Sequence, residues 1–325
     1  MKSTAIAPSN IAFIKYWGKK DEKLKLPENG SISMNLSNLI TTTTVEFSPK
    51  FKKDLVIINN QNDSKRSGRV IKLLDLIRKK ANIFLKAKVV SQNNFPEGTG
   101  LSSSASGFAA LTLAATKSSG LNLNEKELSI LARQGSGSAC RSIPDGFVEW
   151  LDGDSSETSY AKILYPPDYW NIIDVVVIVS QEKKETSSTD GQKSASTSPF
   201  FQTRLNNIKE KIGRFKKALE TKNFTDFGQI IEGEALELHA IMLTSIPSLI
   251  YWQPETIKLM KLVKKWRSEG LEVYFTVNTG QDIHVIVEEK NKEQLLAKLK
   301  EINEVKNIFI NKPAVGARLV ENHLF

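Results

Sequence analysis

Cysteine, histidine and long apolar runs are scarce in this chain of 325 residues, which has one cysteine and three histidines. The single cysteine, Cys140, excludes an internal disulfide and suits a reducing compartment, so we expect a cytoplasmic protein. No window approaches the roughly 18 unbroken apolar residues of a membrane helix, so we expect no membrane partner. The N-terminal segment has no long apolar region before a cleavage site, and we predict that it forms a first strand rather than a signal peptide.

Negative charge is also in deficit, because 36 acidic residues stand against 45 lysines and arginines and leave a net charge of +9. The lysines are scattered over predicted helix faces, with no basic stripe of interleaved aromatic residues and no known nucleic-acid module. We therefore expect no nucleic-acid partner. An excess of positive charge equally suits a small substrate that carries several negative charges.

The length is typical of two packed α/β domains rather than of one core. In the first half, short runs rich in Val, Ile, Phe and Thr predict strands, and apolar residues at helical spacing predict helices between them. The predicted strands are 41–47, 55–59, 87–91, 146–151 and 172–180, and the predicted helices are 67–81, 106–118 and 125–133.

The character of the chain changes after residue 180. A polar stretch at 182–198 has few large apolar groups and predicts a loop or a mobile helix-loop. We place a domain boundary near 181–185, which gives domains of residues 1–182 and 183–325. The second domain is predicted to be α+β, with helices 199–221, 225–244 and 254–269, strands 271–277 and 282–287 around a turn at 278–281, and a helix-strand pair at 292–310.

The segment 94–105 joins a predicted strand to a predicted helix and is rich in small residues. Glycines let the backbone approach a ligand closely, and a helix N-terminus presents unpaired N–H groups to an anion. Its serine hydroxyls can bind phosphate oxygens or Mg²⁺, with Ser104 as the expected Mg²⁺ contact; the alternative is a serine-rich N-cap on an ordinary helix. No Gly-Lys-Ser/Thr follows, so it is not a Walker loop. The candidate phosphate or nucleotide loop residues are Gly98, Gly100, Ser102, Ser103 and Ser104.

The pattern Pro-x-x-x-Gly-Leu-x-Ser-Ser-Ala in this loop resembles the phosphate loop of the GHMP kinase superfamily, which includes galactokinase, homoserine kinase and mevalonate kinase. Further segments resemble, more narrowly, the diphosphomevalonate decarboxylase family, and the resemblance covers nearly the whole chain in order. These segments are 10–19 (NIAFIKYWGK), 26–33 (LPENGSIS), 133–142 (RQGSGSACRS), 146–150 (GFVEW), 197–201 (TSPFF) and 239–242 (HAIM).

The resemblance implies a GHMP-kinase-like α+β fold of two domains, a ribosomal-S5-like N-terminal α/β domain and a ferredoxin-like α+β C-terminal domain. It also implies a carboxy-lyase of the mevalonate pathway of isoprenoid biosynthesis, acting on a small phosphorylated mevalonate. Dimers are common among the proteins that the chain resembles, so a homodimer is the expected assembly.

Individual residues of the matching segments acquire roles from the resemblance. Lys15, Tyr16 and Lys19 are expected to line the pocket for the substrate phosphates, because ammonium groups neutralise oxygen anions well. Read without the resemblance, they are two surface lysines and a packed aromatic residue. The helix start at 135–142 is expected to bind substrate through Ser136, Gly137 and Ser138.

Arg141 is the principal catalytic candidate. A guanidinium can bind a carboxylate with two parallel hydrogen bonds, and the resemblance implies that this residue holds the carboxyl group that leaves as CO₂. The alternative is an arginine that caps a helix or bridges the domains. Cys140, His239 and His284 are interpreted as packing residues, since the histidines have no spacing of a metal site.

The chain departs from the family in the turn at 278–282. The family has Asp-Ala-Gly-Pro-Asn, and its Asp lies beside the tertiary 3-hydroxyl of the substrate as base or orienting charge. Here Asn278 takes that position, and an amide neither accepts a proton at neutral pH nor supplies negative charge. Asp282, four residues later, is the alternative carboxylate. A second departure, Pro144-Asp145 in place of Tyr-Gly, puts an acid near an anion site.

The loss of the base favours a substrate that already carries a phosphate at O3. The leading hypothesis is therefore an archaeal-type decarboxylase that converts mevalonate 3,5-bisphosphate to isopentenyl phosphate and requires no cofactor. The alternative is an enzyme dependent on ATP and Mg²⁺ that acts on mevalonate 5-diphosphate or 5-phosphate. Further alternatives are a mevalonate 3-kinase-like enzyme, which does not decarboxylate, and a non-catalytic ligand-binding relative.

Overall fold

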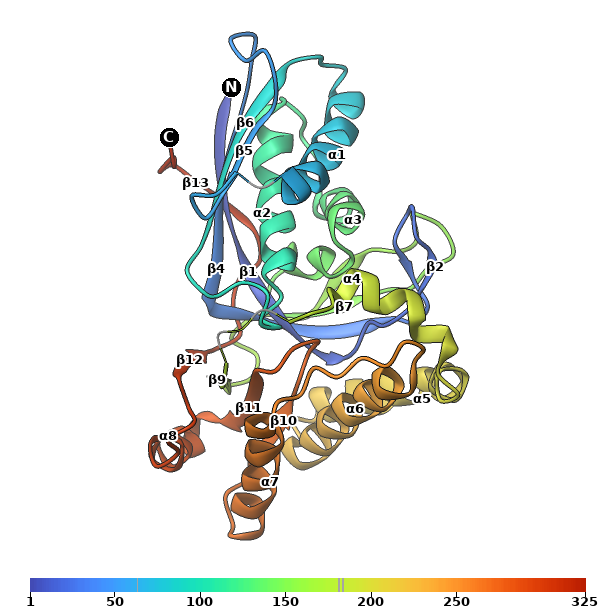
Figure 1. Cartoon of the computed structure of the whole chain (residues 1–325), viewed down its shortest axis with the longest axis vertical. Coiled ribbons are helices and arrows are strands. Elements are labelled where there is room, and N and C mark those ends of the chain that lie inside the picture. Colours follow the sequence, from blue (N-terminus) through green and yellow to red (C-terminus); the bar gives the residue numbers. More distant parts are fainter. Residues whose placement is uncertain (63, 181, 183) are drawn as a thin grey trace.

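The structure is a computed structural model that describes the chain except for residues 63, 181 and 183. Two sheets lie one above the other along the long axis of the molecule (Figure 1). The helices of the first sheet cover one face, whereas residues from both faces of the second sheet pack against helices. The predicted α+β architecture with two domains is confirmed. Within the described residues, none of the helices has the length and apolar content needed to cross a membrane.

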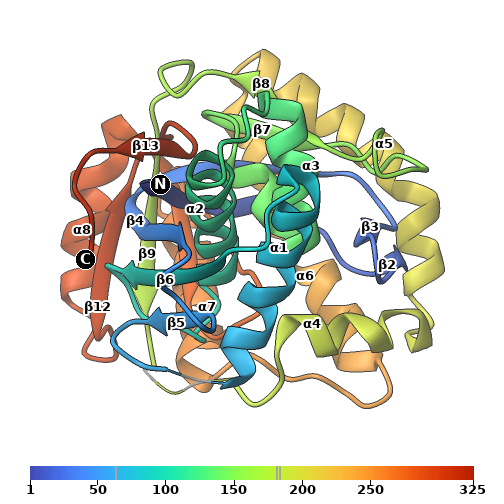
Figure 2. The same ribbon diagram turned by 90° about the horizontal axis from the view of Figure 1, so that it is seen from above.

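The first sheet has seven strands and runs β13-β1-β4-β6-β5, with β7 paired to β4 and β8 to β7. Every pairing is antiparallel except that of β5 with β6. Helices α1, α2 and α3 cover one face, as Figure 2 shows from above. The strands are β1 (Lys2–Ile14), β4 (Ser31–Ser48), β5 (Leu55–Ile58), β6 (Lys86–Asn93), β7 (Phe147–Trp150), β8 (Ala161–Tyr165) and β13 (Arg318–Val320), and the helices α1 (Ser64–Ala81), α2 (Ser103–Ser118) and α3 (Glu125–Gly135).

The second sheet has four antiparallel strands in the order β10-β11-β9-β12. Short helices α4 and η2 fill the polar stretch that was predicted as a loop or mobile helix-loop. The strands are β9 (Ile172–Ile178), β10 (Tyr274–Thr276), β11 (Ile283–Glu288) and β12 (Asn307–Asn311), and the helices α4 (Ser188–Gly191), η2 (Gln192–Thr197), α5 (Phe201–Glu220), α6 (Phe224–Thr244), α7 (Pro254–Ser268), η3 (Glu289–Asn291) and α8 (Lys292–Lys300).

Two strands belong to a different sheet from the one that their position along the chain suggests. Strand β9 lies before the expected boundary, yet it forms the centre of the second sheet between β11 and β12. At the other end, β13 returns to pair with β1 of the first sheet. The expected boundary at 181–185 itself falls partly on residues outside the described part of the chain. The second sheet therefore takes a strand that the sequence analysis assigned to the first domain.

Local signals explain several helix boundaries. Asn124 and Glu127 form a capping box at the start of α3, in which each side chain accepts the backbone N–H of the other at 3.0 Å. Pro254 occupies the first turn of α7, as predicted, where its missing N–H costs no hydrogen bond. These signals place the helices without help from the rest of the fold.

A shared apolar core joins the two domains. Phe13 at the end of β1 contacts Phe227 of α6 with ring centroids 4.9 Å apart, and Trp170 lies against the same Phe227 ring at 5.3 Å. Aromatic rings bury large areas and so contribute strongly to such a junction. The residues that follow Phe13 are thereby held between the domains, and this is where the candidate site lies.

Candidate active site

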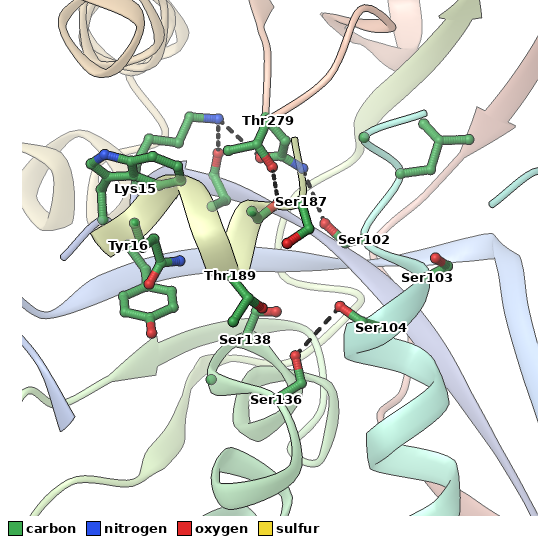
Figure 3. A pocket seen from close by; sticks show the side chains of 18 of the residues that line it. Lys15, Tyr16, Ser102, Ser103, Ser104, Ser136, Ser138, Ser187, Thr189 and Thr279 are labelled. Carbon is green, nitrogen blue, oxygen red and sulfur yellow. Dashed lines mark hydrogen bonds between the residues drawn. The ribbon is translucent and has the colours of Figure 1, made fainter. Parts of the chain in front are cut away.

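A cavity of about 210 Å³ opens at the junction of the two domains. Its walls are the end of β1, the glycine-serine loop before α2, the short helix η1 (Gly137–Ser142), α4 and the turn after β10 (Figure 3). Of the predicted site residues, all but Asp282 line it: Lys15, Tyr16, Lys19, Gly98, Gly100, Ser102, Ser103, Ser104, Ser136, Gly137, Ser138, Arg141 and Asn278.

The cavity is strongly cationic. No carboxylate is present among the described residues that line it. Lys19 is paired with Glu22 at 2.9 Å, and this acid is half exposed at the rim. Such a surplus of positive charge suits a ligand with several phosphate or carboxylate groups. The six cationic lining residues are Lys15, Lys19, Lys25, Arg69, Arg141 and Lys184.

The glycine-serine loop has the backbone of a ligand-binding turn. Gly98 and Gly100 have φ values of +80° and +110°, a region that favours glycine. Ser102 is the N-cap residue of α2 in a left-handed conformation, but its side chain makes no capping hydrogen bond. Its hydroxyl instead accepts from Asn278 Nδ2 at 3.3 Å, across the domain junction. The alternative of an ordinary serine cap does not describe this loop.

Arg141 is buried without a counter-ion. Its Nη1 donates to Ser31 Oγ at 2.6 Å and its Nη2 to Asn10 Oδ1 at 3.2 Å, whereas its Nε is buried without a partner. Within the described residues it forms no ion pair, and burial lowers the pKa of the guanidinium. A buried charge is costly unless it is paired, so this geometry provides for an anionic ligand such as a carboxylate.

Tyr16 and Arg141 both line the cavity, and both lie against the ring of Trp150. Its ring packs edge-on to Trp150 with centroids 4.6 Å apart, and a Cβ at Gly137 would lie 2.8 Å from the ring. The Tyr16 hydroxyl is buried and has no partner within the described residues. Burial raises its pKa, so the hydroxyl stays protonated and can donate a hydrogen bond to a bound ligand.

Lys15 is held by both its main chain and its side chain. Its backbone N–H donates to Glu234 Oε1 at 2.8 Å, so α6 of the second domain fixes its position. Its Nζ donates to Ala12 O and Thr276 Oγ1 at 2.7 Å each, and to Asn278 Oδ1 at 3.2 Å. Burial lowers the pKa of this ammonium to about 7, although Glu234 opposes the shift. Lys15 thus lines the cavity as predicted, with its Nζ held by three hydrogen bonds, and its contact with substrate phosphates stays a prediction.

Asn278 connects the two sides of the cavity through its hydrogen bonds to Lys15 and Ser102. Its backbone oxygen bonds His239 Nε2 at 2.9 Å, and this imidazole stacks on Trp252. Burial lowers the pKa of His239 to about 3, so the ring is neutral and Nε2–H is the donor. The predicted packing role of His239 is confirmed, and its effect is to support the Asn278 turn.

Asp282 lies away from the cavity. Its Oδ1 accepts the backbone N–H of Val179 at 3.2 Å, and burial raises its pKa to about 6. The turn is held in this direction because Thr256 Oγ1 donates to Gln281 O at 2.6 Å and Gln281 Nε2 donates to Glu182 O at 2.7 Å. The structure therefore does not bring Asp282 to the position where it would replace a carboxylate at residue 278.

Asp145, the other unexpected acid, also faces away from the anion-binding side chains. Its Oδ1 accepts the backbone N–H of Gly316 at 2.6 Å. Gly316 packs against the carbonyl oxygens of Ile143 and Pro144, since a Cβ there would lie 2.1 Å and 2.5 Å from them. Asp145 thus anchors the segment that leads to β13, and it adds no repulsion to the site.

Several lining residues were missed by the sequence analysis. Lys184, Ser187, Ser188 and Thr189 come from the polar stretch before and within α4, and Lys25 comes from the hairpin of β2 (Lys19–Asp21) and β3 (Leu26–Pro27). Lys184 Nζ donates to Thr279 O at 2.6 Å, and its burial lowers the pKa to about 8. The signal was present as a stretch rich in hydroxyl groups with three lysines, which loop composition alone does not distinguish from a solvated loop.

A second cavity of about 520 Å³ lies on the other side of the glycine-serine loop. Its wall between α1, α2 and the first sheet is apolar and includes Val70, Val89 and Phe108. The two cavities share residues of the loop, so a single ligand can extend from one into the other. The shared lining residues are Arg69, Gly98, Ser103, Ser104, Ser187 and Thr189.

Comparisons of the sequence with known proteins all match one family. A family model described as "Diphosphomevalonate decarboxylase-like N-terminal domain" matches residues 7–161, and one described as "Mevalonate 5-diphosphate decarboxylase C-terminal domain" matches 174–318. The diphosphomevalonate decarboxylase of Candida albicans is 36% identical over 315 residues, 91% of this chain and 87% of the relative. The human protein of the same name is 34% identical over 300 residues, 85% of this chain and 74% of the relative.

Solved structures of relatives superpose on the whole chain. Mevalonate diphosphate decarboxylase from Staphylococcus aureus has a TM-score of 0.94 at 38% identity, with 98% of each chain covered. The enzyme from Enterococcus faecalis gives 0.92 at 39% identity, with 99% of each chain covered. A structure described as "MDDEF in complex with MVAPP, AMPPCP and Magnesium" gives 0.93 at 40% identity, again with 99% of each chain covered. The expected two-domain fold is thereby confirmed.

Proposed function

The chain belongs to the diphosphomevalonate decarboxylase family, and we propose that it converts mevalonate 5-diphosphate to isopentenyl diphosphate with ATP and Mg²⁺. It is accordingly a carboxy-lyase of the mevalonate pathway. The leading hypothesis of an archaeal-type bisphosphate decarboxylase that yields isopentenyl phosphate is not supported, because the relatives reported above are diphosphomevalonate decarboxylases. These relatives favour the ATP-dependent alternative instead.

The observation that carries this proposal is the pair of cavities that meet at the glycine-serine loop. A substrate phosphorylated in advance at O3 needs only the cationic cavity. The adjoining apolar cavity, with Val70 and Phe108 in its wall, provides a site for the base of a nucleotide. Its phosphates would then follow the loop and the N-terminus of α2 toward the cationic cavity.

The residues present fit a nucleotide with bound Mg²⁺. No group of three or more His, Cys, Asp or Glu side chains in the described part of the chain is arranged to hold a metal by itself. The metal would therefore be held mainly by phosphate oxygens, with the Ser104 hydroxyl at the loop as the protein ligand, and it would neutralise phosphate charge. Magnesium is commonly bound in this way in phosphoryl-transfer sites.

The cationic cavity accounts for the remaining chemistry. Phosphoryl transfer depends mostly on positioning and on charge stabilisation, so the absence of a carboxylate at residue 278 does not preclude it. After transfer to O3, the C–O bond to that phosphate breaks with its electron pair, and the C–C bond to the carboxylate breaks to give CO₂ and the alkene. Arg141 would hold the carboxylate, while Lys25, Lys19 and Ser138 would bind the 5-diphosphate.

An assay with four substrate conditions tests the proposal. Purified protein is given mevalonate 5-diphosphate with MgATP, mevalonate 5-phosphate with MgATP, mevalonate 3,5-bisphosphate without nucleotide, and MgATP alone. We expect CO₂, ADP and isopentenyl diphosphate in equal amounts from the first mixture. Isopentenyl phosphate from the bisphosphate alone would restore the leading hypothesis, and ADP without CO₂ would indicate a 3-kinase.

The contact between the loop and the turn gives a second prediction. A Cβ at Gly280 would lie 2.1 Å from the carbonyl oxygen of Thr99, so Gly280→Ala must push the Asn278 turn away from the loop. Displacements of this size at a reacting centre cost about 10²-fold in rate, and we expect that loss in kcat/KM for the ATP-dependent reaction. The control is Gly213→Ala in α5, where a Cβ meets nothing within 4 Å.

The control variant Gly213→Ala should change stability but not kinetics. Gly213 is exposed on helix α5 and far along the chain from the loop, so alanine should raise the free energy of unfolding by about 0.8–1 kcal/mol without changing kcat/KM. Steady-state kinetics and thermal unfolding of both variants provide the measurement. Unchanged kinetics in Gly280→Ala would show that the loop and turn do not act together.

A further inference from the structure

Transfer of a phosphoryl group to a tertiary hydroxyl releases a proton, and the cavity must take it up. The described residues that line the cavity include neither a carboxylate nor a histidine. Asn278 cannot accept the proton, and Asp282 points toward Val179 instead. The candidate proton acceptors are therefore the lysines of the cavity.

Resting on the proposed function, we propose that Lys15 accepts the proton of the substrate's 3-hydroxyl, and that Asn278 keeps Lys15 in the neutral form that can do so. Lys15 Nζ lies 3.2 Å from Asn278 Oδ1, and both residues face the cavity. The other two partners of Nζ, Ala12 O and Thr276 Oγ1, lie at 2.7 Å and hold the amine in place.

The surroundings of Lys15 stabilise a neutral amine as well as an ammonium. A neutral amine keeps two N–H groups, which satisfy Ala12 O and Thr276 Oγ1, and it gains a lone pair on the Asn278 side. In the free protein, rotation of the Asn278 amide by half a turn then lets Nδ2 donate to that lone pair while Oδ1 accepts from the Ser102 hydroxyl. The 3-hydroxyl of the substrate takes the place of Nδ2 at the lone pair when Lys15 accepts its proton. A carboxylate at residue 278 could accept from the Ser102 hydroxyl but could not donate to the lone pair, since it has no N–H group.

Electrostatics favour the same state. Burial is the largest influence on Lys15 and lowers its pKa to about 7, and the nearby guanidinium groups of Arg141 and Arg204 act in the same direction. Glu234 on α6 and Asp174 on β9 oppose them, and the facing His239 is neutral. Because Asn278 carries no charge, no carboxylate of the cavity adds to this opposition. An aspartate at 3.2 Å would raise the Lys15 pKa strongly.

The other lysines of the cavity are less suited to the task. Lys19 is paired with Glu22, and the Lys184 ammonium is committed to Thr279 O and Ser188 Oγ at 2.6 Å and 2.8 Å. Lys25 lies at the β2–β3 hairpin, on the side proposed for the 5-diphosphate, which would hold it as an ammonium. Among the described lysines of the cavity, Lys15 is the one that is fully buried, and its amide partner can reverse their hydrogen bond.

The proposed step balances as follows. The 3-hydroxyl oxygen forms a bond to the γ-phosphorus, the bond from that phosphorus to the bridging oxygen breaks, and ADP leaves with the electron pair. The hydroxyl proton passes to the Lys15 amine, which becomes an ammonium. When the C3–O bond breaks in the next step, the same ammonium lies ready to donate this proton to the departing phosphate, and the site is reset.

The test is the pH dependence of the single-turnover rate of ADP formation with mevalonate 5-diphosphate. For the native chain we expect one acidic limb with a midpoint near the Lys15 pKa of about 7. Lys15→Arg should lose about 10²–10⁴-fold at every pH, because a guanidinium keeps the charge but takes no proton. Asn278→Asp should move the limb downward by more than one pH unit, because the new carboxylate serves as base.

The double variant is the sharpest discriminator. The variant with both Lys15→Arg and Asn278→Asp should react at least tenfold faster than Lys15→Arg alone, since the carboxylate replaces the missing proton acceptor. If Lys15 has only a structural role, the second substitution should not raise the rate. Titration of the substrate phosphates is common to all four proteins and cancels in the comparison. A limb that stays in place in Asn278→Asp, or no rescue in the double variant, would overturn the inference while leaving the proposed function intact.

A measurement without turnover examines the same point in the full chain. Carbon-13 NMR of lysine-labelled protein, with Lys15→Arg used to assign the Lys15 Cε signal, should give a titration midpoint near 7. The midpoint should rise by more than one unit in Asn278→Asp. A midpoint near the ordinary lysine value of about 10.4 would overturn the inference. Absence of turnover in every protein at every pH would instead overturn the proposed function, and the inference with it.

Discussion

Replacing Arg141 with glutamine is expected to lower kcat/KM by roughly 30- to 5,000-fold, because removing one partner of a buried charge pair costs about 2–5 kcal/mol. The partner in this case is the ligand carboxylate, since Arg141 is 3% exposed and pairs with no acid in the described structure. Loss of decarboxylation should exceed loss of ADP formation, because the proposed role of the guanidinium is to hold the group that leaves as CO₂.

The same substitution should leave the free protein at least as stable as the native chain. Arg141 is a buried cation whose Nε lacks a partner, so its removal relieves a desolvation cost that only a bound ligand offsets. We expect a melting temperature that is unchanged or higher, by roughly 2–4 °C for each kcal/mol gained. Addition of mevalonate 5-diphosphate should stabilise the native chain and not the variant.

Arg133 supplies the matched control. It is also buried, but its donors are used by the protein: Nε donates to Leu24 O at 3.1 Å and Nη2 to Ser156 Oγ at 2.8 Å, with Nη1 bonded to the carbonyl of Ser159. Arg133→Gln should therefore lower the free energy of unfolding by about 1–3 kcal/mol. If Arg141→Gln destabilises the free protein as much as Arg133→Gln does, its guanidinium has a structural role rather than a ligand-binding one.

The fold could be predicted where a local pattern decides it. Helices α3 and α7 begin at capping residues close to the predicted starts, and most predicted strands are present. The short strand β13 was missed because its partner β1 lies at the other end of the chain. Strand β8 was also missed, although its partner β7 is the preceding strand. Strand β9 has all seven residues buried, and a continuous apolar run does not tell which of two sheets contains it.

The site could be predicted where short motifs carry it, and not where folding brings distant residues together. The loop at Gly98–Ser104 and the Arg141 segment line the same cavity as predicted. The three hydrogen bonds of Lys15 Nζ could not be read from sequence, since Thr276 and Asn278 lie more than 260 positions away. For the same reason the placement of Asp282 away from the cavity depended on tertiary contacts that fix the turn.

Breaking the buried ion pair between Arg204 and Glu234 is expected to destabilise the protein by up to about 3–5 kcal/mol, because a buried carboxylate loses one of its two ion-pair partners. Both side chains are fully buried, and Arg204 Nη2 lies 2.6 Å from Glu234 Oε1. Arg204→Ala leaves Glu234 with Lys211 alone, at 2.8 Å. Urea unfolding at pH 7 gives the loss, and Lys217→Ala, which breaks an exposed pair with Glu220, should cost less than about 1 kcal/mol.

The pH dependence of this loss identifies its origin. Burial raises the pKa of the Glu234 carboxyl, but the Arg204 and Lys211 cations outweigh this effect and hold the pKa below its ordinary value. A lowered carboxyl pKa gives stability that is present above the unfolded value of about 4.3 and is lost as the pH falls through the lower folded value. The difference between native chain and Arg204→Ala should therefore shrink below about pH 4. A difference that stays constant to lower pH would assign the loss to packing instead.

The pair also holds Lys15, the proposed proton acceptor, so its removal should affect kinetics beyond stability. Glu234 Oε1 accepts the Lys15 backbone N–H at 2.8 Å, and Arg204 Nη2 donates to Lys15 O at 3.0 Å. Replacing both members by methionine removes the buried carboxylate that has lost its Arg204 partner and should recover most of the stability that Arg204→Ala loses. It leaves the Lys15 peptide with Asn29 Nδ2, which donates to Lys15 O at 2.9 Å, but without its contacts to α5 and α6, so kcat should remain depressed while stability returns. Recovery of both together would show that the network supports the fold alone and that Lys15 needs no such positioning.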